Sequence, residues 1–261
     1  MQLFWYRRFP RLTHFARRLV GASYEREMEL LDVLCDRQRT GIDVGAKVGM
    51  YTYRIRANSS DVIAFEPIPL FNNMLKKVFA GKRGRVEPVA VSNAAGRAVL
   101  RMPFDHTGGA QFGRSTIDCA NRLTHAICAR TEELEVETRT IDCYALPKVG
   151  FIKIDVEGHE VAVLEGATRT IATSTPNLLI ECNDDHQPDA RAKLTGWLGA
   201  HAYEGFFVHD RRIVPMAHYL RSEHWDKYTI ENFICIHRSR SDVRERLVAR
   251  VATAKMGQPA Q

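Results

Sequence analysis

Residues 42–51, with the sequence IDVGAKVGMY, place the strongest constraint on the fold of this chain. Ile42 and Val44 are β-branched and suit a buried strand, while Gly45 and Gly49 let the backbone turn sharply and approach a ligand closely. A helix that begins just after this loop adds unpaired N–H groups and the positive end of its dipole. The segment therefore predicts a strand, a glycine loop and a helix N-terminus that together form a ligand-binding turn.

A second apolar strand, VIAFE at residues 62–66, ends in an acid. Glu66 follows Gly45 by 21 residues, the spacing at which an acid typically binds the two hydroxyls of a ribose. The glycine pattern is G-x-x-x-G, whereas a dinucleotide site uses G-x-G-x-x-G to bring backbone against a pyrophosphate. Asp43 disfavours a pyrophosphate but suits a cofactor with a cationic amino-acid end, such as S-adenosylmethionine.

A third apolar strand ends at Asp155, within FIKIDVEGHE at residues 151–160. A helix is expected to begin near His159. Ligands of open α/β sheets lie beyond the carboxyl ends of the strands. We therefore expect Asp43, Glu66 and Asp155 to face one crevice.

At this point the chain resembles the FkbM family of S-adenosylmethionine-dependent methyltransferases. The segments that carry the resemblance are IDVGAKVGMYT (42–52), VIAFEPIPLF (62–71), VEPVAVSNAAG (86–96), TRTID (138–142), FIKIDVEGHEVAVLEGA (151–167), PNLLIEC (176–182) and ENFICIH (231–237). The resemblance runs over about residues 38–237, and its most specific part is KIDVEGHE followed by VLEGA. The chain departs from the family at Lys47, where Asn is usual.

The resemblance implies an α/β Rossmann-like class I methyltransferase fold, with a mostly parallel seven-stranded sheet, helices on both faces and an antiparallel last strand. Strands that alternate with helices also predict a parallel sheet with right-handed crossovers. The expected strands are 40–44, 61–66, 85–91, 151–155, 177–181, 203–208 and 231–237, and the expected helices are 49–57, 69–80, 160–172 and 188–200. Further strand-like stretches lie at 97–102 and 134–141. The last two strands lack a long helix between them and predict a hairpin.

The expected organisation is an N-terminal helical basic arm at 1–37, a methyltransferase domain at 38–237 and a basic C-terminal tail at 238–261. An insertion at about 103–132 is rich in Gly, Thr, Asn and His. Long insertions of this kind often cover a substrate site.

The residues expected to contact the cofactor lie in the glycine loop, at neighbouring strand ends and at the start of the first helix: Asp43, Gly45, Lys47, Gly49, Tyr51, Thr52, Glu66, Pro67, Val91, Ser92 and Asp155. Ser92 follows the third strand, where this fold holds adenine, and Val91 is expected to pack on the ring. Tyr51 could equally be a core residue.

Asp155, His159 and Glu181 are the candidates for the chemistry. A hydroxyl acceptor is a very weak acid, so a base near it matters. Asp155 lies where methyltransferases place the residue nearest the methyl group, and Glu181 ends a strand at the same edge. His159 has a useful intrinsic pKa, although a solvated residue in a first helical turn is an equal alternative. Glu181 could instead form an ion pair under the insertion.

Asp184, Asp185 and His186 follow Glu181 and, with Asp155, form a set that could bind a divalent cation. Acidic loop clusters are more often solvated. No residue is therefore assigned as a metal ligand, and a divalent metal is not favoured.

The net charge of +6 belongs to the chain ends, since residues 1–20 carry +5, residues 238–261 carry +4 and the rest carries −3. A nucleic-acid groove on the catalytic body is therefore not expected. Within residues 1–20, Leu12, Phe15 and Leu19 at helical spacing predict a basic amphipathic helix. Such a helix can lie on an anionic membrane surface, or it can pack on the domain or on a second subunit in a homo-oligomer.

The chain has no apolar run of the roughly 18 residues needed to span a membrane, and it has no apolar signal region. Its six cysteines show no paired metal-ligand spacing. These features predict a cytoplasmic protein, peripheral at the inner membrane face if the arm binds there.

The sequence thus predicts an S-adenosylmethionine-dependent O-methyltransferase. The resemblance implies a hydroxyl acceptor on a saccharide, a glycolipid or a polyketide-like small molecule. Two alternatives remain open: an NAD(P)-dependent oxidoreductase, and a catalytically inactive cofactor-binding partner subunit.

Overall fold

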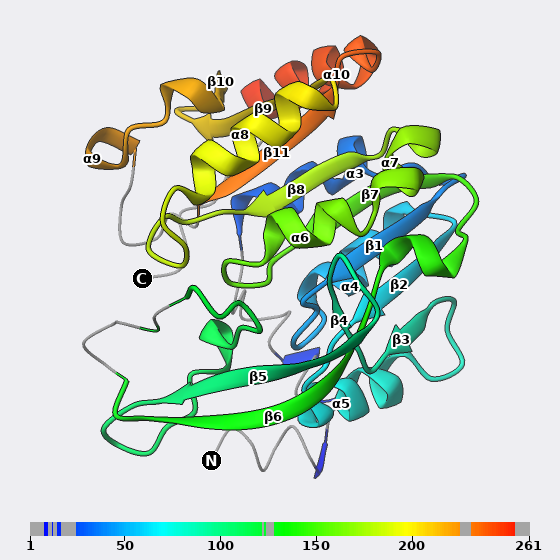
Figure 1. Ribbon diagram of the computed structural model, residues 1–261. Helices are drawn as coiled ribbons and strands as arrows, with labels where there is room; N and C mark the ends of the chain where they lie inside the picture. The colour runs from blue at the N-terminus through cyan, green and yellow to red at the C-terminus, as the bar shows by residue number, and fades with distance from the viewer. Residues whose placement is uncertain are drawn as a thin grey trace.

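An eight-stranded sheet lies at the centre of the computed structural model, which describes residues 25–121, 123, 128–224 and 231–253, together with residues 8, 9, 12, 15 and 16 (Figure 1). Its strands are β1 (Thr40–Val44), β2 (Asp61–Phe65), β3 (Arg85–Glu87), β7 (Val149–Ile154), β8 (Asn177–Glu181), β9 (Tyr203–His209), β10 (Arg212–Pro215) and β11 (Asn232–His237). They are arranged in the order β10-β9-β11-β8-β7-β1-β2-β3.

The pairing confirms the predicted methyltransferase topology. Strands β3, β2, β1, β7 and β8 are parallel, while β11 is antiparallel to both β8 and β9. The last strand is therefore antiparallel, as expected. The sheet has one strand more than the predicted seven because β10 pairs with the outer edge of β9. As a result β9 and β11 are neighbours but are not joined by a simple hairpin.

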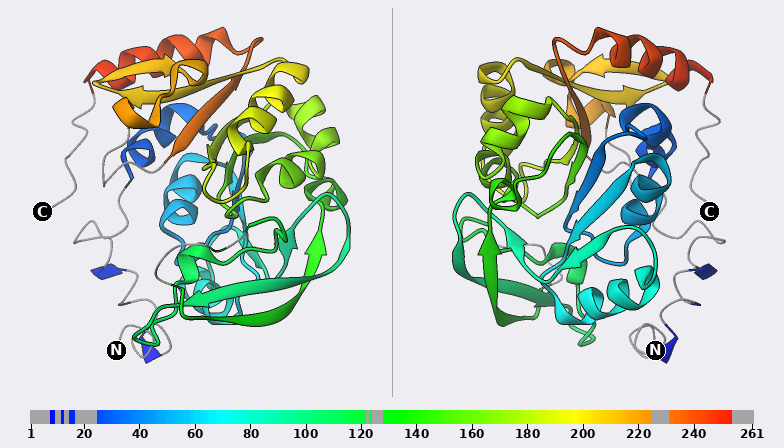
Figure 2. Two further views of the ribbon diagram at one scale, coloured as in Figure 1. Left: turned by 60° about the vertical axis from the view of Figure 1, so that its left-hand side comes forward. Right: turned by 90° about the vertical axis from the view of Figure 1, so that its right-hand side faces the viewer.

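Helices cover both faces of the sheet because its central strands are apolar on both sides; all six residues of β7 are buried. One face is covered by α6 (Glu160–Glu165), α7 (Thr168–Ser174) and α8 (Ala190–Ala200), and the other by the 3₁₀ helix η1 (Arg26–Leu30), α3 (Leu31–Leu34), α4 (Met50–Asn58) and α10 (Ser241–Thr253). Figure 2 shows these two layers on opposite sides of the sheet. The expected helix 160–172 is divided at Gly166, which lies against the backbone of Ser92.

The core extends beyond the expected domain limits of 38–237. Leu30 and Leu31 before the domain, and Leu247 and Val251 after it, are fully buried in one cluster with Phe151 of β7. Residues 25–34 and 241–253 are therefore parts of the folded domain. Most of the predicted arm helix at 1–20 lies outside the described residues. Three of its apolar side chains are described, and Phe9, Leu12 and Phe15 are all exposed. None of the described helices is long and apolar enough to cross a membrane.

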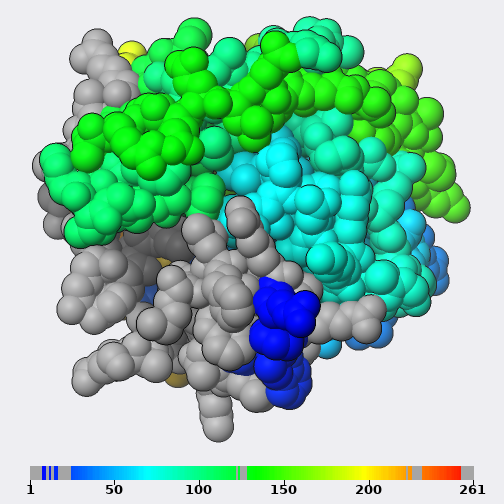
Figure 3. Space-filling model, turned by 90° about the horizontal axis from the view of Figure 1, so that it is seen from below, coloured from blue at the N-terminus to red at the C-terminus, as the bar shows by residue number. Residues whose placement is uncertain are grey.

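A second, three-stranded sheet is formed by β4 (Ala90–Val91), β6 (Arg130–Arg139) and β5 (Gly96–Phe104), in that order. The expected strand 85–91 is thus two strands in two sheets. Pro88 lies between them and has no N–H to donate to a continuous ladder. The loop between β5 and β6 carries most of the predicted insertion and the 3₁₀ helix η2 (Phe112–Arg114). Figure 3 shows the hairpin and its loop beside α5 (Pro69–Phe79) on one face.

Candidate functional site

A cavity of about 570 Å³, including the space at its mouth, lies at the carboxyl ends of β1, β2 and β7. Its walls also include residues of β4, β5 and the insertion. The lining residues are Val44, Gly45, Lys47, Phe65, Glu66, Pro67, Ile68, Val89, Ala90, Val91, Leu100, Phe112, Gly113, Ser115, Thr116, Ile117, Asp155, Val156 and Glu157. Apolar walls with a few polar groups at strand ends are typical of a small-molecule site.

The glycine loop approaches the end of β7 closely. Gly45 has φ +80°, and a Cβ there would lie 1.9 Å from the carbonyl oxygen of Asp155. Gly49, at φ +79°, directly precedes α4. Lys47 also has a positive φ, 51°, which is uncommon for a residue with a side chain. The loop therefore requires glycine at Gly45 and presents Lys47 to the cavity.

Glu66 is buried and is held by two backbone amides. Its Oε2 accepts a hydrogen bond from Lys47 N and its Oε1 accepts one from Ile68 N, each at 2.8 Å. Burial raises the pKa of Glu66 to about 7, against the opposing effect of these two hydrogen bonds. A carboxylate oxygen has a second lone pair. Glu66 can therefore accept two further hydrogen bonds from a ligand without releasing the loop.

Four of the expected cofactor residues lie beneath the loop and do not line the cavity. Asp43 accepts a 2.5 Å hydrogen bond from the Thr52 hydroxyl, and burial raises the pKa of Asp43 to about 6. The hydroxyl of Tyr51 donates to Glu25 at 2.7 Å. Gly49 closes the turn by donating its N–H to Ala46 O. These residues shape the loop, whereas Gly45, Lys47, Glu66, Pro67, Val91 and Asp155 line the cavity itself.

Three carboxylates gather beside the cavity. One oxygen each of Asp155, Glu157 and Glu181 lies within 4.8 Å of the others. Lys153 Nζ lies 2.9 Å from Asp155 Oδ2 and is almost fully buried. Burial alone raises the pKa of Asp155, but the charges of Lys153 and Lys47 outweigh it and lower that pKa to about 2.

The other two acids of this cluster hold protons more tightly. Burial and then the charge of Asp155 raise the pKa of Glu157 to about 8, and the same two causes raise the pKa of Glu181 well above its ordinary value. A divalent cation could be held by three such acids. Lys153 and Lys47 already supply two positive charges beside them, so we assign no metal ligand here.

The loop acids proposed as a metal set with Asp155 have separate partners. Asp184 pairs with Arg191 at 2.5 Å, and Asp185 pairs with Arg221 at 2.7 Å. His186 instead lies against Glu157, with Nε2 3.0 Å from Oε2. The structure therefore does not bring these three side chains together on Asp155.

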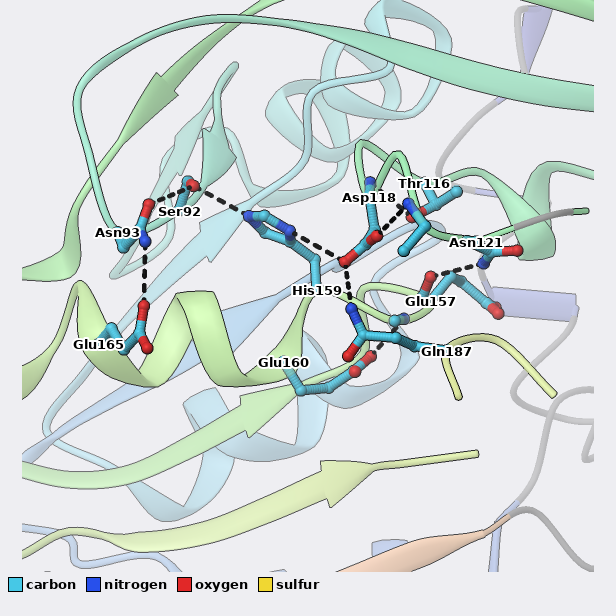
Figure 4. A network of polar contacts seen from close by, with 12 residues as sticks. Ser92, Asn93, Thr116, Asp118, Asn121, Glu157, His159, Glu160, Glu165 and Gln187 are labelled. Carbon is cyan, nitrogen blue, oxygen red and sulfur yellow. Dashed lines mark hydrogen bonds and ion pairs between the residues drawn. The ribbon is translucent and has the colours of Figure 1, made fainter. Parts of the chain in front are cut away.

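His159 belongs to a polar network that joins the insertion to the sheet (Figure 4). Its Nε2 lies 2.9 Å from Ser92 Oγ, and its Nδ1 lies 3.7 Å from Asp118 Oδ2. Burial lowers the pKa of His159, against the opposing charge of Asp118. Gln187 Nε2 donates to the same Asp118 oxygen at 2.9 Å. Neither Ser92 nor His159 is among the residues that line the cavity.

The residues that the sequence did not indicate come mainly from the second sheet and the insertion. Leu100, Phe112 and Ile117 give the cavity much of its apolar wall, and Asn121 Nδ2 donates to Glu157 O at 2.8 Å. Leu100 lies on β5, within the expected strand-like stretch 97–102, whereas the loop that carries Phe112, Ile117 and Asn121 follows no helical or strand periodicity. The one available signal was the apolar character of Phe112 and Ile117 within an otherwise polar insertion.

The sheet order, the glycine loop after β1 and the acid after β2 define a class I methyltransferase fold. The sequence profile of the methyltransferase FkbM domain matches residues 43–211, which is more than half of the chain. The chain therefore belongs to the FkbM methyltransferase family.

One solved FkbM methyltransferase agrees with this fold. The methyltransferase FkbM from Methylobacillus flagellatus KT is similar with a TM-score of 0.51 and 16% identity, covering 77% of this chain and 44% of that chain. SMU.1697c, a putative methyltransferase from Streptococcus mutans in complex with SAH, has a TM-score of 0.43 and 11% identity, covering 80% and 93%. The chain thus spans less than half of the FkbM structure that it matches. No curated protein matches the chain.

Proposed function

We propose that the chain is an S-adenosylmethionine-dependent O-methyltransferase that acts on a hydroxyl of a saccharide, a glycolipid or a polyketide-like small molecule. One observation carries the proposal: a single cavity combines a buried acid after β2, an apolar wall and a charged carboxylate after β7. Each of these fits a different part of the cofactor. Family membership supports the reaction class.

Different residues of the cavity contact different parts of the cofactor. Glu66, already oriented by two amides, accepts hydrogen bonds from the ribose hydroxyls. The apolar wall, which includes Ile68 and Val91, packs on the adenine ring. Asp155 is charged and attracts the cationic part, while the ammonium of Lys47 suits the carboxylate of the amino-acid end.

When bound, S-adenosylmethionine supplies a methyl group already activated by its sulfonium. The protein then has to align the acceptor, exclude water and take the proton of the acceptor hydroxyl. The insertion covers the cavity with η2 and residues 115–117, which favours exclusion of water.

A labelled-methyl assay tests this function. The enzyme is incubated with S-adenosylmethionine that carries an isotopic methyl group and with saccharide and glycolipid extracts of the host cell. We expect label in a methyl ether that survives mild alkali. Label found only in protein, nucleic acid or an alkali-labile ester would contradict the acceptor class.

We also propose a cellular location and an assembly for the protein. The basic amphipathic helix predicted from the sequence within residues 1–20 would suit peripheral contact with an anionic membrane from the cytoplasmic side, and it would equally suit a homo-oligomer. Vesicle binding that is lost when residues 1–20 are deleted supports the first. A changed oligomeric state on deletion supports the second.

A further inference from the structure

Glu157 lies where two cavities meet. Besides the cavity described above, a narrow cleft of about 340 Å³, most of it open to solvent at its mouth, is lined by Pro103, Gln111, Arg114, Asn121, Leu123, Cys128, Glu157 and His186. Of all the lining residues, Glu157 is the one that the two cavities share. A molecule in the second cavity and a cofactor in the first would therefore meet at Glu157.

The backbone of Glu157 has an unusual conformation and is bonded to the insertion. Its φ is +56°, a left-handed conformation that is uncommon for a residue with a side chain. The insertion contributes a hydrogen bond from Asn121 Nδ2 to Glu157 O at 2.8 Å, which Figure 4 shows. Unusual backbone of this kind is concentrated at functional sites.

The side chain of Glu157 is buried beside one imidazole. Its Oε2 lies 3.0 Å from His186 Nε2, which is ion-pair distance, but among the described residues no donor meets hydrogen-bond geometry toward this oxygen. Glu157 is only 9% exposed. A buried carboxylate oxygen without a firm donor is costly in a folded protein, and a ligand hydroxyl would supply that donor.

We propose that the second cavity binds the acceptor and that Glu157, positioned by His186, accepts the proton of the acceptor hydroxyl. This inference rests on the proposed methyltransferase function. The carbon–oxygen bond forms as the methyl carbon–sulfur bond breaks, and the electron pair of that bond stays on sulfur. The hydroxyl proton passes to Glu157 and then, by way of His186, to solvent.

The other candidate bases are less well placed. Asp155 is ion-paired with Lys153 and stays charged, so it is a weak proton acceptor. Glu181 lines neither cavity, and His159 has a polar partner at each ring nitrogen. Glu157 has a pKa raised to about 8, chiefly by burial, which is close to the pH at which an efficient general base operates.

The charge of the second cavity indicates the class of acceptor. Its polar lining includes Gln111, Asn121 and the guanidinium of Arg114, for which the described residues provide no ion-pair partner. A guanidinium binds carboxylate and phosphate groups well. We infer an acceptor that carries a carboxylate or phosphate in addition to the hydroxyl that is methylated.

Glu157→Gln tests the base, because it keeps the shape and removes the charge. We expect a folded variant that binds S-adenosylmethionine within a few-fold of the wild type by calorimetry. Turnover in the labelled-methyl assay should fall by at least about 100-fold. Glu245→Gln, the same change at an exposed position of α10, is the matched control and should leave turnover unchanged. Near-normal turnover of Glu157→Gln would overturn the assignment.

The pH profile gives a second, independent test. The carboxylate form is the active one, so kcat/KM of the wild type should rise with pH up to about 8. The groups that face Glu157 and take part in this titration are Lys47, Lys153, Asp155, Glu160, Glu181 and His186. Infrared difference titration of the protein alone, wild type minus Glu157→Gln, should show a protonated carboxyl that ionises over the same range. His186→Gln should shift the pKa observed in this titration. An unchanged pKa would show that His186 does not position Glu157.

The chemical class is read from the labelled product. We expect it to bind an anion exchanger, and phosphatase treatment then separates a phosphate, which is released, from a carboxylate, which is retained. Arg114→Gln should weaken the apparent affinity for the acceptor at least about tenfold. A labelled product that passes through the exchanger as a neutral molecule would overturn the inferred class. A wild-type protein that binds S-adenosylmethionine but labels nothing would instead contradict the proposed function.

Discussion

Lys153 Nζ and Asp155 Oδ2 lie 2.9 Å apart at the carboxyl end of β7, and Lys153 is almost fully buried there. The ammonium also lies 5.0 Å from the centre of the Tyr51 ring, and the hydroxyl of Tyr51 donates to Glu25. A buried chain of contacts thus joins the cofactor cavity to the segment before β1. The ion pair with Lys153 helps to keep Asp155 negatively charged at the wall of the cavity.

Asp155→Asn should weaken S-adenosylmethionine binding at least about tenfold, because it removes a charge-assisted contact of roughly 1.5–3 kcal/mol. Calorimetric titration measures this directly. At saturating cofactor, turnover should fall less than in Glu157→Gln. If binding is retained within a few-fold and turnover is lost, Asp155 itself is the base, as the sequence first suggested. Activity that survives a chelator would exclude an exchangeable metal from this site.

Glu66→Ala should weaken S-adenosylmethionine binding at least about tenfold, by the loss of hydrogen bonds from the ribose. It also frees the amides of Lys47 and Ile68, so the loop loses its anchor. Glu87→Ala, in which a half-buried acid on β3 outside the cavity is removed, serves as the control. An unchanged affinity in Glu66→Ala would remove Glu66 from the ribose site.

The network around His159 should act as a clamp on the insertion. His159→Gln and Asp118→Asn are expected to increase proteolysis of the loop between β5 and β6 to a similar extent. The double variant should add little to either, because both single variants lose the same contact between His159 and Asp118. Turnover should fall by less than about tenfold. A loss of 100-fold or more in His159→Gln with the loop still protected would make His159 the general base.

The last helix should be needed for stability even though it lies in a basic tail. Leu247 is fully buried, and Leu247→Ala is expected to lower the free energy of unfolding by about 2–5 kcal/mol. Val248 is 50% exposed, so Val248→Ala should change it by no more than about 0.5 kcal/mol. Urea denaturation compares the two. Equal, small effects would place α10 outside the core.

Most of the central sheet could be predicted from the sequence because its strands are short apolar runs that end in acids or glycines. Strands β1, β2, β7 and β8 agree with the expected ranges within two residues. The stripe of Val243, Leu247 and Val251 recurs every four residues and indicates α10, but the surrounding arginines led us to expect only a tail. Strand β10 is four residues long, begins with Arg212 and ends with Pro215, so it is too short to carry a periodic signal.

The site was only partly predictable for a different reason. Residues at strand ends, such as Glu66 and Asp155, are placed by the topology, so spacing along the chain was sufficient to bring them together. Arg114, Asn121 and His186 come from irregular loops far apart in the sequence, and their meeting depends on how those loops pack. The role of each carboxylate also depends on its surroundings. The ion pair with Lys153 lowers the pKa of Asp155, whereas the pKa of Glu157 is raised, and this difference was not predicted from the sequence.

Calorimetric titration of the wild-type protein with S-adenosylhomocysteine and, in parallel, with NADH tests the central claim most directly. The cavity lined by Glu66 and Asp155 should bind S-adenosylhomocysteine at one site per chain, and NADH should give no heat of binding because the loop lacks the glycines that admit a pyrophosphate. Binding of NADH without S-adenosylhomocysteine would contradict the methyltransferase account and return the chain to the oxidoreductase alternative.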